Sequence, residues 1–187
     1  MINNVLINLV YLFYPKNICS LTEQNEYLES KEHKRLLGII KHFEANKSLY
    51  FDLEKTFKKD AVIKNIRDMS LLDYKDRTLT FQLTVVVERE LFTVTLYLSI
   101  LIPFYLIMVQ KNKIELIFSE NEIVKMENEK TDTRNIKVLV EDISSFVETT
   151  MLYSKFPEQL CNKIIEDVSF EEIPLGRFTM FNAFFKN

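Results

Sequence analysis

The fold of this chain is decided by residues 78–110, which read TLTFQLTVVVERELFTVTLYLSILIPFYLIMVQ. Apolar residues fill every second position on both sides of Glu88-Arg89-Glu90. Because successive side chains of a strand point to opposite faces, this period of two is typical of strands that bury one face. The alternating apolar positions are Leu79, Phe81, Leu83, Val85 and Val87, followed by Phe92, Val94, Leu96, Leu98, Ile100 and Ile102. The stretch therefore predicts two antiparallel strands joined by a charged hairpin turn.

Two further strands are predicted directly after this hairpin. Pro103 cannot donate a backbone hydrogen bond to a neighbouring strand, so it marks a strand end, and residues 104–111 then form an apolar third strand. A turn at Lys111-Asn112-Lys113 leads into a fourth strand that ends near residue 118. The prediction is an antiparallel meander over about residues 77–118, whose central strands need helices to cover them.

The same region contains a run of 20 residues without a charge, 91–110. Its length would suit a transmembrane helix, but a helix has no reason to keep a period of two, so no membrane span is predicted. Residues 1–14 are also apolar, yet they lack the basic start and the small-residue cleavage site of a signal peptide. We expect them to form a buried first strand that Pro15 ends.

Helical patterns flank the predicted meander. The predicted helices are residues 26–43, a short helix with Leu49, Leu53 and Phe57 on one side, residues 133–153, and a helix that begins at Pro157 and buries Leu160, Ile164 and Ile165. An aromatic-rich last strand is predicted at residues 178–185. A chain of 187 residues suffices for one sizeable core and is short for two. We therefore expect residues 1–187 to form a single α+β domain, with meander and terminal strands covered by about four helices.

Composition excludes several classes of function. Gly38 and Gly176 are the only glycines, so no glycine-rich loop can cradle a phosphate or a dinucleotide. With 24 basic and 27 acidic side chains the net charge is −3, which gives no global positive field for nucleic acid. Cys19 and Cys161 lie far apart and suggest neither a disulfide framework nor a zinc site. A reducing, cytoplasmic compartment is expected.

The residues that usually carry catalysis are few. His33 and His42 are nine positions apart on one predicted helix, which places them on opposite sides of it, and we interpret both as surface residues. We interpret Cys161 as a small core residue. The sequence contains no GxSxG or HExxH motif and no spacing typical of metal ligands. We therefore expect a protein that is not an enzyme and has no catalytic residues, no cofactor and no metal.

Acidic residues are concentrated in the C-terminal half of the chain. Residues 1–67 hold 11 basic and 8 acidic side chains, whereas residues 114–172 hold 6 basic and 14 acidic ones. An acidic face selects a basic partner, although a solvated surface would have the same composition. The predicted partner-binding residues are Glu120, Glu122, Glu127, Glu129, Asp132, Glu166, Asp167, Glu171 and Glu172, with Tyr153, Phe156 and Phe170 as aromatic anchors or, alternatively, core residues.

Three stretches carry a resemblance to a known class of proteins. They are Tyr14-Pro15-Lys16-Asn17-Ile18, the helix Tyr27-Leu28-Glu29-Ser30-Lys31-Glu32-His33-Lys34-Arg35-Leu36, and the strand end Ser99-Ile100-Leu101-Ile102-Pro103-Phe104-Tyr105. Over about the first three fifths of its length, the chain resembles small proteins encoded beside bacterial polymorphic toxins, which serve as immunity proteins for contact-dependent or type VI secretion effectors. The resemblance implies a cytoplasmic, non-enzymatic protein that binds one cognate toxin and blocks its active site. It marks no individual functional residue.

Two other interpretations stay open. A pocket between the sheet and its helices would make the chain a ligand-binding or enzymatic domain, with Thr95, Tyr97, Ser99 and Tyr105 as its polar lining. An exposed last strand at residues 178–185 would instead join copies of a scaffold protein.

Overall fold

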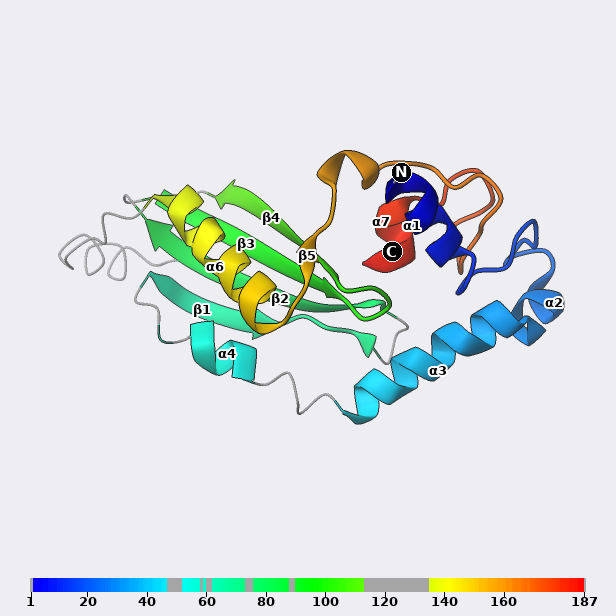
Figure 1. Cartoon of the computed structure of the whole chain (residues 1–187), viewed down its shortest axis with the longest axis horizontal. Helices are drawn as coiled ribbons and strands as arrows, with labels where there is room; N and C mark the ends of the chain where they lie inside the picture. Colours follow the sequence, from blue (N-terminus) through cyan, green and yellow to red (C-terminus); the bar gives the residue numbers. More distant parts are fainter. Residues whose placement is uncertain are drawn as a thin grey trace.

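A five-stranded sheet forms the centre of the molecule (Figure 1). The computed structural model describes residues 2–46, 52–57, 59, 62–72, 76–87, 90–112 and 135–186. The strands are β1 (Ile63–Asp68), β2 (Thr78–Val87), β3 (Glu90–Ser99), β4 (Phe104–Asn112) and β5 (Ser154–Lys155), in that order across the sheet. All neighbours are antiparallel except β4 and β5, which are parallel. The predicted α+β fold with an antiparallel sheet is confirmed.

The hairpin predicted from residues 78–110 forms the middle of this sheet. Thr78 pairs with Ser99 at one end of the β2–β3 ladder, and Val87 pairs with Glu90 at the other. Strand β1 was not predicted, because Ile66 is its only buried side chain and the apolar alternation is missing. The predicted fourth strand at 113–118 lies outside the described residues.

Helix α6 (Ile136–Thr150) lies across one face of the sheet (Figure 1). Its buried residues Leu139, Ile143 and Val147 recur every four positions, which confirms the helix predicted at 133–153. On the sheet below, Tyr105 donates a hydrogen bond of 2.7 Å to Oε1 of Glu148 on α6. Helix α6 therefore covers the face of the sheet that carries Tyr105.

Helix α7 (Met180–Phe184) replaces the last strand predicted at 178–185, which is wrong. The Thr179 hydroxyl accepts from the Asn182 amide at 3.2 Å, and Asn182 Oδ1 accepts from the Thr179 amide at 3.0 Å. This capping box starts a helix at that point. Phe184 and Phe185 are fully buried, so the segment offers no free strand edge for a scaffold.

Helix α1 (Ile2–Val10) replaces the buried first strand predicted at 1–14, which is also wrong. Leu6 and Val10, one helical turn apart, are buried, whereas Ile2 and Val5 are 48% and 53% exposed. The stretch is apolar almost throughout and does not alternate. A short run of this kind does not distinguish a strand from a helix by periodicity.

The helix predicted after Pro157 is reduced to one 3-10 turn, η4 (Glu158–Leu160). The Ile165 amide donates to the Phe178 carbonyl at 2.7 Å, and the Met180 amide donates to the Lys163 carbonyl at 2.9 Å. The backbone here thus pairs with the segment before α7 and cannot continue a helix. Ile164 is half exposed, against the buried position predicted for it, while Ile165 and Cys161 are buried as predicted.

The helix predicted at 26–43 is two helices, α2 (Gln24–Glu29) and α3 (Lys31–Ala45). Ser30 separates them with extended backbone angles, and its hydroxyl accepts from the His33 amide at 3.2 Å. This is the N-cap of α3.

The short helix α4 (Asp52–Phe57) lies where it was predicted. In the described part of the chain, no helix has the length and apolar character needed to cross a membrane.

Replacing the cap, Ser30→Ala, is expected to lower the free energy of unfolding by about 1 kcal/mol, because an amide at the start of α3 loses its acceptor. Urea denaturation measures the change. Ser145→Ala, at an exposed position inside α6, is the matched control and should change stability by less than about 0.5 kcal/mol. An equal effect of both substitutions would contradict the capping role.

Candidate functional site

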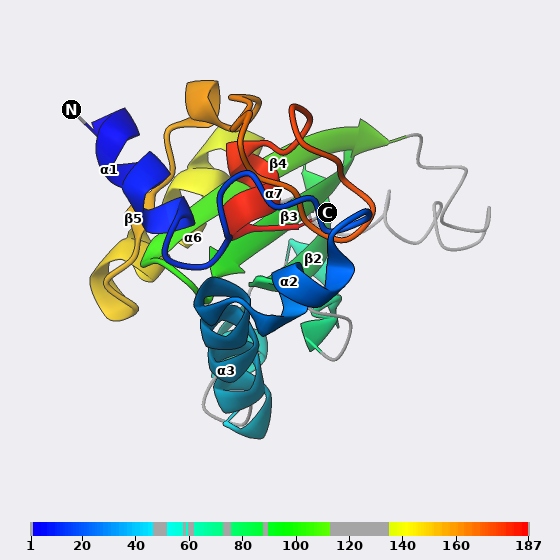
Figure 2. The same ribbon diagram turned by 90° about the vertical axis from the view of Figure 1, so that its right-hand side faces the viewer.

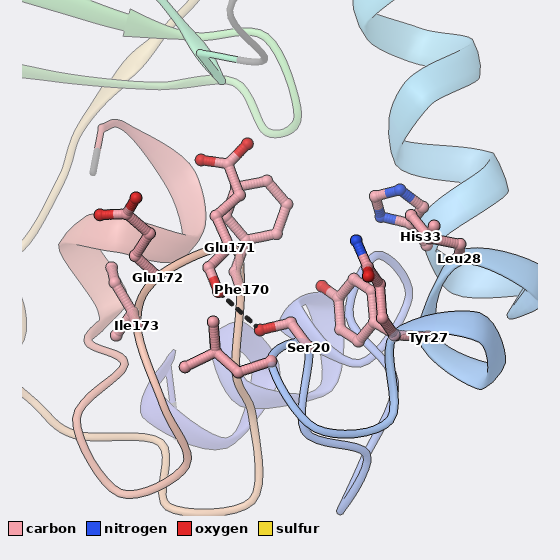
Figure 3. A pocket seen from close by; sticks show the side chains of 10 residues that line it. Ser20, Tyr27, Leu28, His33, Phe170, Glu171, Glu172 and Ile173 are labelled. Atoms are coloured by element: carbon pink, nitrogen blue, oxygen red, sulfur yellow. Dashed lines mark hydrogen bonds between the residues drawn. The ribbon is translucent and has the colours of Figure 1, made fainter.

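A pocket of about 530 Å³ opens between α2, the start of α3 and a tight turn at residues 170–173 (Figure 3). Both overall views place α2 beside the loop that carries this turn (Figures 1 and 2). The described residues that line it are Ser20, Leu21, Gln24, Tyr27, Leu28, His33, Phe170, Glu171, Glu172 and Ile173. The two walls thus come from opposite ends of the sequence.

Polar contacts join the two walls. The Ser20 hydroxyl donates to the Glu171 carbonyl at 2.9 Å, shown as a dashed line in Figure 3. The Ser20 amide donates to the Ser169 hydroxyl at 2.7 Å, and that hydroxyl donates to the Ile18 carbonyl at 2.9 Å. Ser169 is fully buried. These bonds hold the segment before α2 against the segment before the 170–173 turn.

The turn itself places two carboxylates together. Phe170 and Ile173 exchange backbone hydrogen bonds of 3.1 and 2.9 Å, so only Glu171 and Glu172 lie between them. Glu171 has a φ of 50°, a left-handed conformation that closes such a two-residue turn. Both glutamates line the pocket; Glu171 is half-buried and Glu172 is exposed.

Aromatic side chains form the inner wall. Tyr27 and His33 are 3% and 2% exposed, and their ring centres are 5.1 Å apart. The ring of Phe170, opposite them, is 6.5 Å from that of His33 and carries the Arg77 guanidinium 4.6 Å from its centre. His33 was predicted at the surface, which is wrong, because the break at Ser30 turns the start of α3 towards this core. His42 is exposed, as predicted.

The Tyr27 hydroxyl is the unusual polar group of the pocket. Burial raises the pKa of this phenol above its usual range, so the group stays protonated. Its oxygen is enclosed and has no hydrogen-bond partner among the described residues. In Figure 3 it points from α2 towards the wall formed by Phe170. A buried hydroxyl without a partner costs about 1–3 kcal/mol, so such groups call for an explanation.

Three of the predicted partner-binding residues meet at this pocket: Phe170, Glu171 and Glu172. Asp167 lies elsewhere, where its two carboxylate oxygens accept from the Tyr11 hydroxyl at 2.8 and 2.9 Å. Glu166 is exposed and does not line the pocket. The remaining predicted acidic residues, Glu120, Glu122, Glu127, Glu129 and Asp132, lie outside the described residues.

The three candidate anchors belong mainly to the core. Phe156 and Phe170 are 1% and 0% exposed, so the alternative given for them, a place in the core, is the one observed. Tyr153 is half-buried and its hydroxyl donates to the Ser99 carbonyl at 3.1 Å. None of the three therefore offers an exposed ring to a partner.

The polar lining predicted for a sheet pocket does not come together. Tyr105 pairs with Leu98, so it lies on the face of β3 opposite to Tyr97. The Tyr97 ring is covered by Phe181 at 5.7 Å. Thr95 and Ser99 do not line the pocket described above either. The sequence reasoning missed Tyr27, Leu21 and Leu28. The signal available for the leucines was their apolar character within the polar stretch of residues 20–30.

Among the described residues, no group of three or more His, Cys, Asp or Glu side chains is arranged to hold a metal ion. Comparison of the chain with family models, with curated proteins and with solved structures found no match.

Proposed function

We propose that this chain is a non-catalytic binding protein that neutralises a cognate bacterial toxin or effector in the cytoplasm. The observation that carries the proposal is the pocket lining, in which Glu171 and Glu172 occur together with two exposed leucines. Leu21 and Leu28 are 55% and 42% exposed although they are large and apolar. Apolar side chains next to charged ones around a depression are typical of sites that bind another protein.

The charge of the pocket supports a basic partner. Its described lining contains two carboxylates and neither lysine nor arginine. Complementary charge accelerates the encounter of two proteins and selects among partners. The toxin class comes from the resemblance of residues 14–18, 27–36 and 99–105 to immunity proteins.

A growth assay tests the proposal. The tagged full chain is used to capture its partner from the source cells, and the captured protein is then expressed in a sensitive bacterial host with or without this chain. We expect the captured protein to stop growth alone and co-expression to restore growth. Growth arrest that this chain does not relieve would overturn the proposal.

Charge reversal at the pocket mouth, Glu171→Lys with Glu172→Lys, is expected to slow association with the partner by about tenfold or more. Surface plasmon resonance at low salt measures the rate. The matched control is Glu44→Lys with Glu141→Lys, two exposed glutamates on α3 and α6 away from the pocket lining. If both double variants associate equally slowly, net charge and not the pocket is responsible.

A second candidate function follows from the volume of the pocket. About 530 Å³ falls within the range of sites that bind small molecules. Native mass spectrometry of the chain purified from its source cells distinguishes the two functions. A bound small molecule in the absence of any toxin partner would favour ligand binding.

A further inference from the structure

The residues that line the pocket indicate which kind of chemical group it can bind. The formal charges of the ionisable side chains at the pocket do not sum to zero. Arg77, behind Phe170, donates from Nε and Nη2 to the Asn182 carbonyl at 3.1 and 2.6 Å. Together with Glu171 and Glu172, this buried cation leaves one net negative charge at the site. A cationic group in the pocket would bring that charge to zero.

The shape of the lining favours a long cation with an apolar stem. Leu21, Leu28 and Ile173 line the pocket, and the two leucines are 55% and 42% exposed. Methylene groups pack well against leucine and isoleucine, and a guanidinium forms paired hydrogen bonds with carboxylates. An arginine side chain combines all of these features in one group.

The Tyr27 hydroxyl adds a hydrogen-bonding requirement at the inner wall. Its oxygen is enclosed and lacks a partner among the described residues, and the Tyr27 ring lies 5.1 Å from the His33 ring. A phenol oxygen accepts from N–H donors, and a guanidinium carries five of them in one plane. A cation that reached this depth would supply the missing donor.

We propose that the pocket between α2, α3 and the 170–173 turn receives an arginine side chain of the protein partner, with Glu171 and Glu172 at its guanidinium and Leu21 and Leu28 along its stem. This inference rests on the proposed function for the source of the arginine. The chemistry of the pocket can be tested without the partner.

The test titrates the full chain with N-acetyl-arginine methylamide and, separately, with the neutral isostere N-acetyl-citrulline methylamide. Binding is followed by NMR shifts of the amides of residues 20–28 and 170–173. We expect the arginine probe to bind with a Kd on the order of 1 mM at low salt. The citrulline probe should bind about tenfold more weakly, since it lacks the charge. Equal binding of both probes would overturn the inference.

Variants assign the binding to the pocket. Glu172→Gln, at an exposed position, keeps the fold and should weaken the arginine probe about fivefold; Glu171→Gln with Glu172→Gln should weaken it further. Tyr27→Phe keeps the ring and should weaken binding about threefold. The control, Glu44→Gln with Glu141→Gln, should bind as the wild type does. An unchanged affinity of the Glu171→Gln, Glu172→Gln variant would exclude this pocket.

The two proposals fail separately. If the arginine probe binds as expected but the captured protein is not neutralised, the pocket chemistry holds and the toxin function is wrong. If the toxin is neutralised but the Gln variants bind the probe and the toxin as the wild type does, the toxin function holds and the arginine pocket is wrong.

Discussion

Replacing Arg77 by alanine is expected to lower the free energy of unfolding by about 3–5 kcal/mol. The side chain is fully buried, and two of its nitrogens donate to the Asn182 carbonyl on α7. Its guanidinium also stacks 4.6 Å from the centre of the Phe170 ring. The substitution leaves the carbonyl of the half-buried Asn182 without these donors and opens a cavity beside Phe170, and both effects destabilise.

Urea denaturation of the two proteins measures this loss. Arg177→Ala is the matched control, because Arg177 is exposed in the turn before α7 and its removal should change stability by less than about 0.5 kcal/mol. Arg77→Lys keeps the charge but not the planar donors, so an intermediate loss is expected. A change below about 1 kcal/mol in Arg77→Ala would show that the buried cation does not support the fold.

The second large effect is expected at Phe170. Phe170→Ala should cost about 3–5 kcal/mol, because the ring is fully buried and its removal opens a cavity. The ring contacts Tyr14 edge-on at 5.5 Å and Phe178 at 6.4 Å. Loss of the ring is therefore expected to loosen the base of the 170–173 turn and, through the fold, to weaken binding of the proposed partner.

Thermal and urea unfolding measure the effect at Phe170. Phe170→Leu, which keeps most of the apolar volume, should recover more than half of the lost stability. Leu152→Ala, at a side chain that is 78% exposed, serves as the control and should have little effect. Normal stability of Phe170→Ala with lost partner binding would instead identify Phe170 as an anchor.

The parts of the fold that sequence reasoning predicted correctly are those with a long local period. Strands β2 and β3 alternate over ten residues each, and α6 repeats its buried positions over fifteen. Both patterns are properties of adjacent residues and need no knowledge of distant contacts. Helices α1 and α7 are short and apolar, so their periods were too brief to separate helix from strand.

The pocket could not be predicted from the sequence, for a different reason. Phe170, Glu171 and Glu172 were named from charge and aromatic content, but nothing local indicates that Ser20 and Tyr27 face them. His33 was placed at the surface because its neighbours on α3 are charged. Its burial depends on the break at Ser30, which directs the start of α3 inward. Contacts between distant segments decide such positions.

The hydrogen bond between Ser20 and Glu171 joins residues 151 positions apart. Bringing two such distant residues together lowers the conformational entropy of the chain before the contact can stabilise the fold. Topologies rich in such contacts therefore fold slowly. We therefore expect the sheet hairpin to form early and the two walls of the pocket to meet late. The pocket walls should also exchange their amide hydrogens faster than β2 and β3, since loops open at a lower free energy than the strands of a core.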